Sequence, residues 1–182
     1  MIGQFKPALL FLIKFLGVYV VGNIFYGLYI AHYLPQSDPV TGWVSYQVAE
    51  VYSIFDQTIS VVPNLIRPTI SLVDTVTNDT IINVFEGCNG INVVIVFLAF
   101  IVAYQGTLKR TIIFSCIGFL IIHLFNLARI MLLFEQAKNH SPYFYYVHKY
   151  FFTAILYFVV VLLWWFWISK FNSLKDDHRG QV

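Results

Sequence analysis

The segment EGCNGI places Cys88 between two glycines, directly before an unbroken apolar run. A cysteine attacks as its thiolate, and the pKa of a thiol falls at the N-terminus of a helix or beside a cation. The position therefore suits a nucleophile if a helix begins here. Gly87 and Gly90 would leave room for a substrate backbone to approach the sulfur.

Two further side chains could complete this chemistry. In HLFNLAR, His123, Asn126 and Arg129 recur every three residues and would form one polar stripe on a helix. Arg129 could stabilise a thiolate or a developing oxyanion. His148 stands just before the last apolar run, where it could act first as a general base and then as a general acid. His123 is more typical of a hydrogen-bonded histidine inside a helix bundle.

The composition indicates where these residues work. The chain has 182 residues, of which 59% are hydrophobic and only 11% are charged, whereas a soluble domain carries about 25% charged residues. The sequence is therefore that of an integral membrane protein. A net charge of +2 from scattered basic residues gives no indication of a nucleic-acid partner. No metal site or cofactor is predicted.

Four apolar segments predict a single all-α membrane domain that comprises residues 1–182. The predicted spans are residues 8–33, 89–104, 111–134 and 150–169. Lysines and arginines concentrate on the side of the two termini, which places both termini in the cytoplasm. Residues 36–87 would then face outward, and residues 170–182 would form a cytoplasmic tail.

The outward segment is predicted to contain an amphipathic helix and a small β-hairpin. Apolar residues recur at helical spacing from Val44 to Val62, opposite polar residues, and Pro63 would end this helix. The following stretch TISLVDTVTNDTIINVF is rich in strand-forming residues around Asn78 and Asp79, which would form the turn.

This topology brings Cys88, Arg129 and His148 to the same outer rim of the membrane domain, from three separate helices. Each residue also has a structural interpretation: a packed thiol, an arginine that snorkels to the interface and an interfacial histidine. Ionisable groups inside a membrane span are costly, so their presence favours a function. Glu86 would pair with Arg129 or His148, or would face water.

The combination of EGCNGI, a later NLAR and a histidine before the last span resembles the exosortase/archaeosortase family of membrane cysteine transpeptidases. The chain is most similar to the exosortase F branch of the Bacteroidota, in CNGINVVIVFLAF, NLARI and VHKYFFTAILYFVVVLLWW. The resemblance extends over most of the chain and is strongest between Ile81 and Trp167. Many members of the family have more spans than the four predicted for this chain.

The resemblance implies a catalytic set of Cys88, Arg129 and His148 on the outer face of the cytoplasmic (inner) membrane. The implied substrates are exported proteins with a C-terminal sorting signal, which consists of a short motif, a transmembrane helix and a basic tail. The cysteine would cleave a peptide bond near that helix through a thioester, and a lipid or glycan component would accept the protein. Residues that would support this set or lie near the substrate are Glu86, Gly87, Asn89, Gly90 and Asn126.

Two other functions remain open on the sequence. A membrane thiol oxidoreductase would use Cys88 together with Cys116, although the chain has no C-x-x-C motif. A non-catalytic scaffold or transporter subunit would need polar residues at several depths of the membrane, or a helix face for partners. Cys116 is otherwise expected to be a packing residue.

Overall fold

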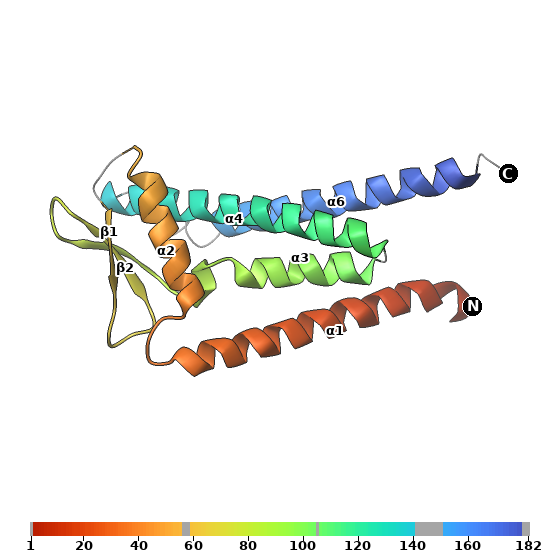
Figure 1. Ribbon diagram of the computed structural model, residues 1–182, viewed down its shortest axis with the longest axis horizontal. Helices are drawn as coiled ribbons and strands as arrows, with labels where there is room; N and C mark the ends of the chain where they lie inside the picture. The colour runs from red at the N-terminus through yellow and green to blue at the C-terminus, as the bar shows by residue number, and fades with distance from the viewer. Residues whose placement is uncertain (1, 56–58, 105, 141–150, 180–182) are drawn as a thin grey trace.

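The computed structural model describes residues 2–55, 59–104, 106–140 and 151–179. The chain is mostly helical, with a small sheet at one end (Figure 1). The elements in chain order are α1 (Ile2–Tyr33), α2 (Pro39–Tyr52), β1 (Ile59–Pro63), β2 (Ile70–Asp74), β3 (Thr80–Val84), the 3-10 turn η1 (Glu86–Cys88), α3 (Ile91–Ala103), α4 (Leu108–Lys138) and α6 (Phe152–Arg179).

Among the described residues, three helices are long and apolar enough to cross a membrane: α1, α4 and the part of α6 from Thr153 to Lys170. They indicate a membrane protein. The remaining predicted span, residues 89–104, is the shorter helix α3. Its 13 residues rise only about 20 Å, which is less than the roughly 30 Å of a bilayer's hydrocarbon core. The helix α3 packs against α1, α4 and α6.

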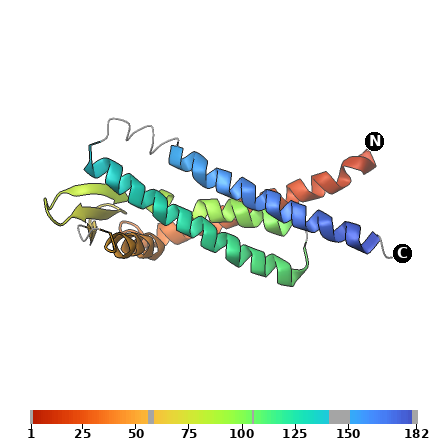
Figure 2. The same ribbon diagram turned by 90° about the horizontal axis from the view of Figure 1, so that it is seen from above.

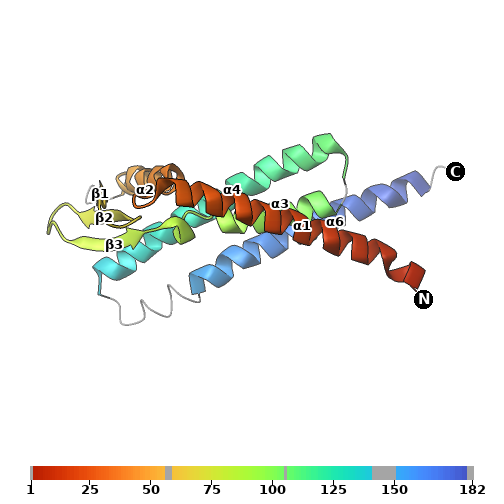
Figure 3. The same ribbon diagram turned by 90° about the horizontal axis from the view of Figure 1, so that it is seen from below.

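The four bundle helices run lengthwise, and α3 lies between α1 on one side and α4 and α6 on the other (Figures 1 and 3). Both chain ends lie at one end of the bundle, while α2 and the sheet lie across the opposite end (Figures 1 and 2). The helix α6 continues to Arg179, so the tail predicted from residue 170 prolongs a helix. The helix α2 and the sheet, which belong to the segment predicted to face outward, form a separate layer across one end of the bundle (Figure 1).

The helix α2 is shorter than the predicted amphipathic helix. It begins after the N-cap Asp38, whose carboxylate accepts hydrogen bonds from two backbone N–H groups of the first turn. It ends at Tyr52, and Ile59 and Val62 lie in β1 instead of continuing the helix, so the prediction was wrong there. The reason is that the β-branched run around them pairs with β2, and such pairing outweighs a helical spacing of apolar residues. Pro63 therefore ends a strand.

The predicted hairpin is confirmed by β2 and β3, which pair in antiparallel fashion around a turn in which Asn78 has a φ of 59°. The strand β1 adds a third strand, and the order β1-β2-β3 makes β3 an edge strand. Every residue of β2 is buried. Its last residue, Asp74, forms an ion pair of 3.1 Å with Lys138, which ties the sheet to the end of α4.

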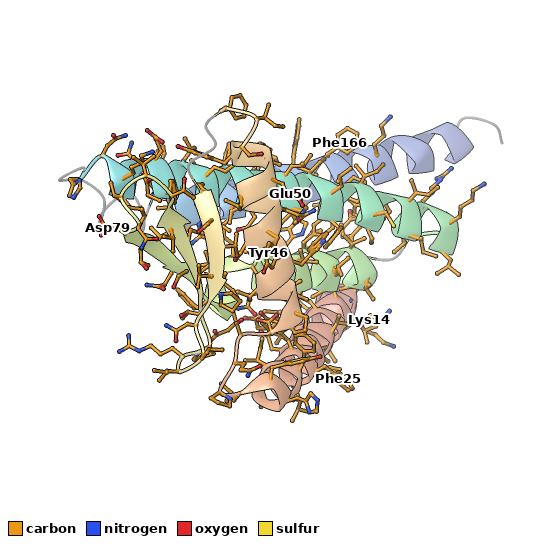
Figure 4. All side chains as sticks on the ribbon, turned by 60° about the vertical axis from the view of Figure 1, so that its left-hand side comes forward. Lys14, Phe25, Tyr46, Glu50, Asp79 and Phe166 are labelled. Atoms are coloured by element: carbon orange, nitrogen blue, oxygen red, sulfur yellow. The ribbon has the colours of Figure 1, made fainter. Side chains whose placement is uncertain are left out.

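The core has two parts. One part lies beneath α2 and the sheet and includes Val48, Leu72 and Phe134; Cys88 belongs to it. The other part lies inside the helix bundle. Figure 4 shows Tyr46 and Glu50 on the outer face of α2, and the exposed fraction of Tyr46 is 50%. Large apolar side chains on α1, α4 and α6 are also exposed, as expected of helices that face lipid. Among them, Phe25 and Phe166 project from α1 and α6, Lys14 also lies on α1, and Asp79 marks the hairpin (Figure 4).

Candidate active site

Cys88 ends the 3-10 turn that joins β3 to α3. Its backbone N–H donates to the carbonyl oxygen of Phe85 at 2.8 Å. The thiol is free, and the residue is only 6% exposed. The following helix begins at Ile91 rather than at the cysteine. Cys88 therefore lies in a short turn before the helix, and the helix itself begins two residues after Asn89, the predicted start of the span.

Gly90 turns the chain from this loop into α3. Its φ of +85° lies in the left-handed region, which glycine adopts without strain. Asn126 of α4 packs closely against it, since a Cβ at Gly90 would lie 3.2 Å from the Asn126 side chain. Asn126 is fully buried, and its Nδ2 donates to the carbonyl oxygen of Cys88 at 2.9 Å. A contact between two helices therefore holds the backbone of the cysteine.

A polar network holds the other side of the loop. Asn89 Nδ2 donates to the hydroxyl of Tyr26 at 2.8 Å and to the hydroxyl of Thr41 at 3.1 Å. The Tyr26 hydroxyl donates to the carbonyl oxygen of Glu86 at 3.1 Å, and the Thr41 hydroxyl donates to the carboxylate of Asp38. These bonds join α1, α2 and the loop of residues 85–90 that carries Cys88 (the cysteine loop) into one unit. Linked bonds of this kind strengthen one another in a buried setting.

This network assigns Asn89 a structural position. The residue is 3% exposed, and its Oδ1 also accepts from the N–H of Ile91 at 3.0 Å. The sequence placed Asn89 among the residues that would support the catalytic set or lie near the substrate, and its hydrogen bonds favour a supporting position. Sequence reasoning missed Tyr26, Thr41 and Asp38 altogether. For Asp38 a signal existed, because an aspartate directly before a proline is typical of a helix N-cap.

Arg129 lies one turn beyond Asn126 on α4. Its Nε is buried and has no hydrogen-bond partner among the described residues. Burial raises the pKa of the Cys88 thiol, and the positive charge of Arg129 offsets that rise only in part. The carboxylate of Glu86 adds to the rise in pKa. The thiolate is therefore disfavoured at this position, and a base would assist a nucleophilic reaction.

A cavity of about 280 Å³ opens beside Cys88, between β3 and α4. Apart from Asn83 and the thiol, its lining side chains are apolar. They are Ile81, Ile82, Val84, Phe85, Ile130 and Leu133. The buried thiol thus borders a pocket whose lining suits an apolar side chain of a ligand.

The glycines around the cysteine serve the packing of the chain itself. A Cβ at Gly87 would collide with the ring of Phe85, and a Cβ at Gly90 would crowd Asn126. The room that we expected these glycines to leave for a substrate is therefore filled by Phe85 and Asn126. An approach to the thiol would come from the cavity instead.

The third predicted residue of the set, His148, lies outside the described residues. His123 occupies a different place from Cys88. Its Nε2 lies 2.8 Å from Oε1 of Gln47, and its ring stacks on Trp43 with 4.9 Å between centroids. It lines a second cavity of about 160 Å³ on the side of Asn89. This agrees with the expectation of a hydrogen-bonded histidine.

Cys116 lies on α4 and is exposed, so it is not the packed residue that we expected. It precedes Asn126, the residue bonded to Cys88, by ten positions, which corresponds to about 15 Å along the helix. A disulfide needs Cα atoms within about 7 Å. Cys88 and Cys116 therefore cannot form a disulfide within this fold.

Comparisons of the chain with protein-family models, with curated proteins and with solved structures gave no significant match.

Proposed function

We propose that the protein is a membrane cysteine protease or transpeptidase that cleaves the C-terminal sorting signals of exported proteins. One observation carries the proposal: a buried free thiol borders an apolar cavity and lies within the electrostatic reach of Arg129. The resemblance to exosortases supplies the reaction type and the third residue, His148. Cys88 is the nucleophile in this proposal.

The reaction proceeds in two halves. His148 takes the proton of the Cys88 thiol, and the sulfur attacks the carbonyl carbon of the scissile peptide bond. Arg129 faces the developing oxyanion. The C–N bond breaks, the amine of the departing anchor takes the proton from His148, and the acyl group remains as a thioester. A lipid or glycan nucleophile, or water, then attacks the thioester and the thiol is restored.

The electrostatics of the described residues favour a mechanism with a base. Burial raises the pKa of Cys88 more than Arg129 lowers it, so Arg129 alone does not produce a resting thiolate. His123 is bonded to Gln47 and lines the other cavity. The resemblance to exosortases assigns the role of base to His148, which precedes α6 in the chain.

The same proposal places the protein in the cytoplasmic membrane with both termini in the cytoplasm. The long helices α1, α4 and α6 span the bilayer, and α3 is a fourth, shorter span. Cys88 then faces the outer side, because its loop lies at the bundle end opposite to the chain ends (Figure 1). The substrate's own transmembrane helix lies beside the bundle in the lipid, and its basic tail stays on the cytoplasmic side.

Two observations on the described residues weigh against a thiol oxidoreductase and against a transporter subunit. Cys116 lies about 15 Å along α4 from Asn126, whose side chain is bonded to Cys88, and this separation argues against a dithiol oxidoreductase. A conduction path would need buried polar groups along the bundle. Among the described residues, buried polar side chains belong to α2 with its N-cap, to β2, to the cysteine loop and to one position of α4: Asp38, Thr41, Ser45, Ser71, Asp74, Asn89 and Asn126.

Processing of a co-expressed exported protein tests the proposal. The reporter is an exported protein from the same genome that ends in a motif, a transmembrane helix and a basic tail. Cys88→Ala is expected to abolish its processing, measured by immunoblot of membrane fractions, while Cys116→Ala leaves processing unchanged. Mass spectrometry of the wild-type protein should detect an acyl adduct on Cys88. Normal processing by a well-expressed Cys88→Ala protein would rule out the mechanism.

A further inference from the structure

The strand β3 is the edge of the sheet that leads into the cysteine loop. Within the part of the chain that the structure describes, it pairs with β2 on one side only. It is followed after Val84 by Phe85 and the turn that ends at Cys88. An edge strand carries unpaired backbone N–H and C=O groups, which can pair with an added strand. Figure 3 shows β3 at the border of the sheet, with the end of α4 beside it.

The cavity beside Cys88 lies along the same strand. Ile81, Ile82 and Val84 form one wall of it, and Ile130 and Leu133 of α4 form the opposite wall. Its volume of about 280 Å³ is slightly below the range of roughly 300–1,000 Å³ for pockets that hold drug-sized molecules. The site therefore suits one or two uncharged side chains. The residues that line the cavity include no charged side chain, so a charged side chain would lose its hydration there without an oppositely charged partner in the lining.

These two features combine into one recognition mode. We propose that the sorting peptide binds in extended conformation along the free edge of β3 and places an apolar side chain in the cavity. Backbone hydrogen bonds to the strand would supply affinity for any sequence, and the cavity would supply selectivity for an uncharged residue. Because the strand leads to the nucleophile, a peptide aligned with it delivers a backbone carbonyl to Cys88. This inference rests on the proposed function and specifies its substrate as an extended, apolar segment.

Peptides that alkylate thiols test the inference on the full-length protein in proteoliposomes. The probes are acetylated tetrapeptides of leucine and alanine that end in a vinyl sulfone. The thiolate adds to the terminal vinyl carbon, the adjacent carbon takes a proton, and no group leaves. Mass spectrometry quantifies the adducts on Cys88 and on Cys116, and the exposed Cys116 corrects for the concentration of each probe in the membrane. N-ethylmaleimide reports whether the thiol itself remains reactive.

Two series of probes separate backbone pairing from side-chain selectivity. In the first series each amide nitrogen is methylated in turn, which blocks one hydrogen bond. Because alternate residues of a strand face its neighbour, methylation should slow Cys88 labelling about fivefold at alternate positions only. In the second series aspartate replaces each residue in turn. One position should then lose at least about tenfold in Cys88 labelling.

A protein variant provides a matched control. Ile82→Glu places a charge on the cavity wall and should slow peptide labelling of Cys88, while labelling by N-ethylmaleimide persists. Val62→Glu makes the same change on β1, where the side chain is 48% exposed, and should leave both rates unchanged.

The possible failures are distinguishable. If methylation acts equally at all positions or at none, or if no peptide labels a Cys88 that N-ethylmaleimide still alkylates, binding along β3 is refuted. Such results would leave the proposed function standing, since that function depends on the processing of the reporter by Cys88. If Cys88→Ala processes the reporter normally, the proposed function fails, and this specification of its substrate fails with it.

Discussion

The hydroxyl of Tyr26 offers the cleanest test of how the cysteine loop is held. Tyr26→Phe removes one oxygen atom, which accepts from Asn89 at 2.8 Å and donates to the carbonyl oxygen of Glu86 at 3.1 Å. No apolar contact of the ring needs to change. The substitution therefore isolates the link between α1 and the loop before Cys88.

The expected loss of stability follows from the number of bonds. Each hydrogen bond contributes about 0.5–1.5 kcal/mol net. Asn89 keeps its bond to Thr41, whereas the Glu86 carbonyl loses the Tyr26 donor. We therefore expect the free energy of unfolding to fall by about 1–2 kcal/mol. For a chain of this size the fall in Tm is about 2–8 °C.

Thermal unfolding of the purified protein in detergent measures this change. Tyr46→Phe is the matched control, because it removes the same atom from a residue that is half exposed on the outer face of α2 (Figure 4). In Tyr26→Phe, Cys88 should also react faster with N-ethylmaleimide, since a looser loop exposes the thiol more often. Equal Tm values and equal labelling rates for the two variants would show that the network does not hold the loop.

Three further predictions concern the site. Arg129→Lys keeps a positive charge but loses the guanidinium fork, so processing should fall while the pH midpoint of thiol alkylation stays in place. Arg129→Gln removes the charge as well. It should therefore also move that midpoint to higher pH, because the remaining influences, led by burial, raise the pKa of the thiol. Gly90→Ala should lower the free energy of unfolding by about 1–3 kcal/mol, because φ is positive there. Gly27→Ala, on a helix with open space around it, should not destabilise the protein. Thermal unfolding compares the two variants. His148→Ala should abolish processing in the reporter assay and His123→Ala should not, and the reverse result would transfer the role of base to His123.

Elements whose pattern is local were predictable from the sequence. The long apolar runs of α1, α4 and α6 gave clear signals, and the hairpin of β2 and β3 followed from strand-forming residues around Asn78. The strand β1 was not predictable in this way. Its run from Ile59 to Val62 also fits a helical spacing, and only the partner strand β2 decides between the two conformations.

The same distinction between local and long-range signals applies to the candidate site. Cys88 and Arg129 could be selected because a thiol between glycines and an arginine in an apolar helix are conspicuous. The bonds that position the loop could not be predicted, because Tyr26 and Asn89 are 63 positions apart in the chain. Their contact depends on how α1 crosses α3. The cavity depends likewise on the packing of β3 against α4.

The Nε of Arg129 and the thiol of Cys88 are both buried at the candidate site. The buried Nε of Arg129 has no acceptor among the described residues, and an unpaired buried donor costs about 1–3 kcal/mol. Burial raises the pKa of the Cys88 thiol and so disfavours a thiolate beside that donor. A thiolate and an oxyanion both arise during the reaction that we propose, and either would be an acceptor for Arg129. An interaction that forms in the transition state and is absent from the resting state accelerates the chemical step. The proposed mechanism therefore expects Arg129 to act on the transition state rather than on the resting thiol.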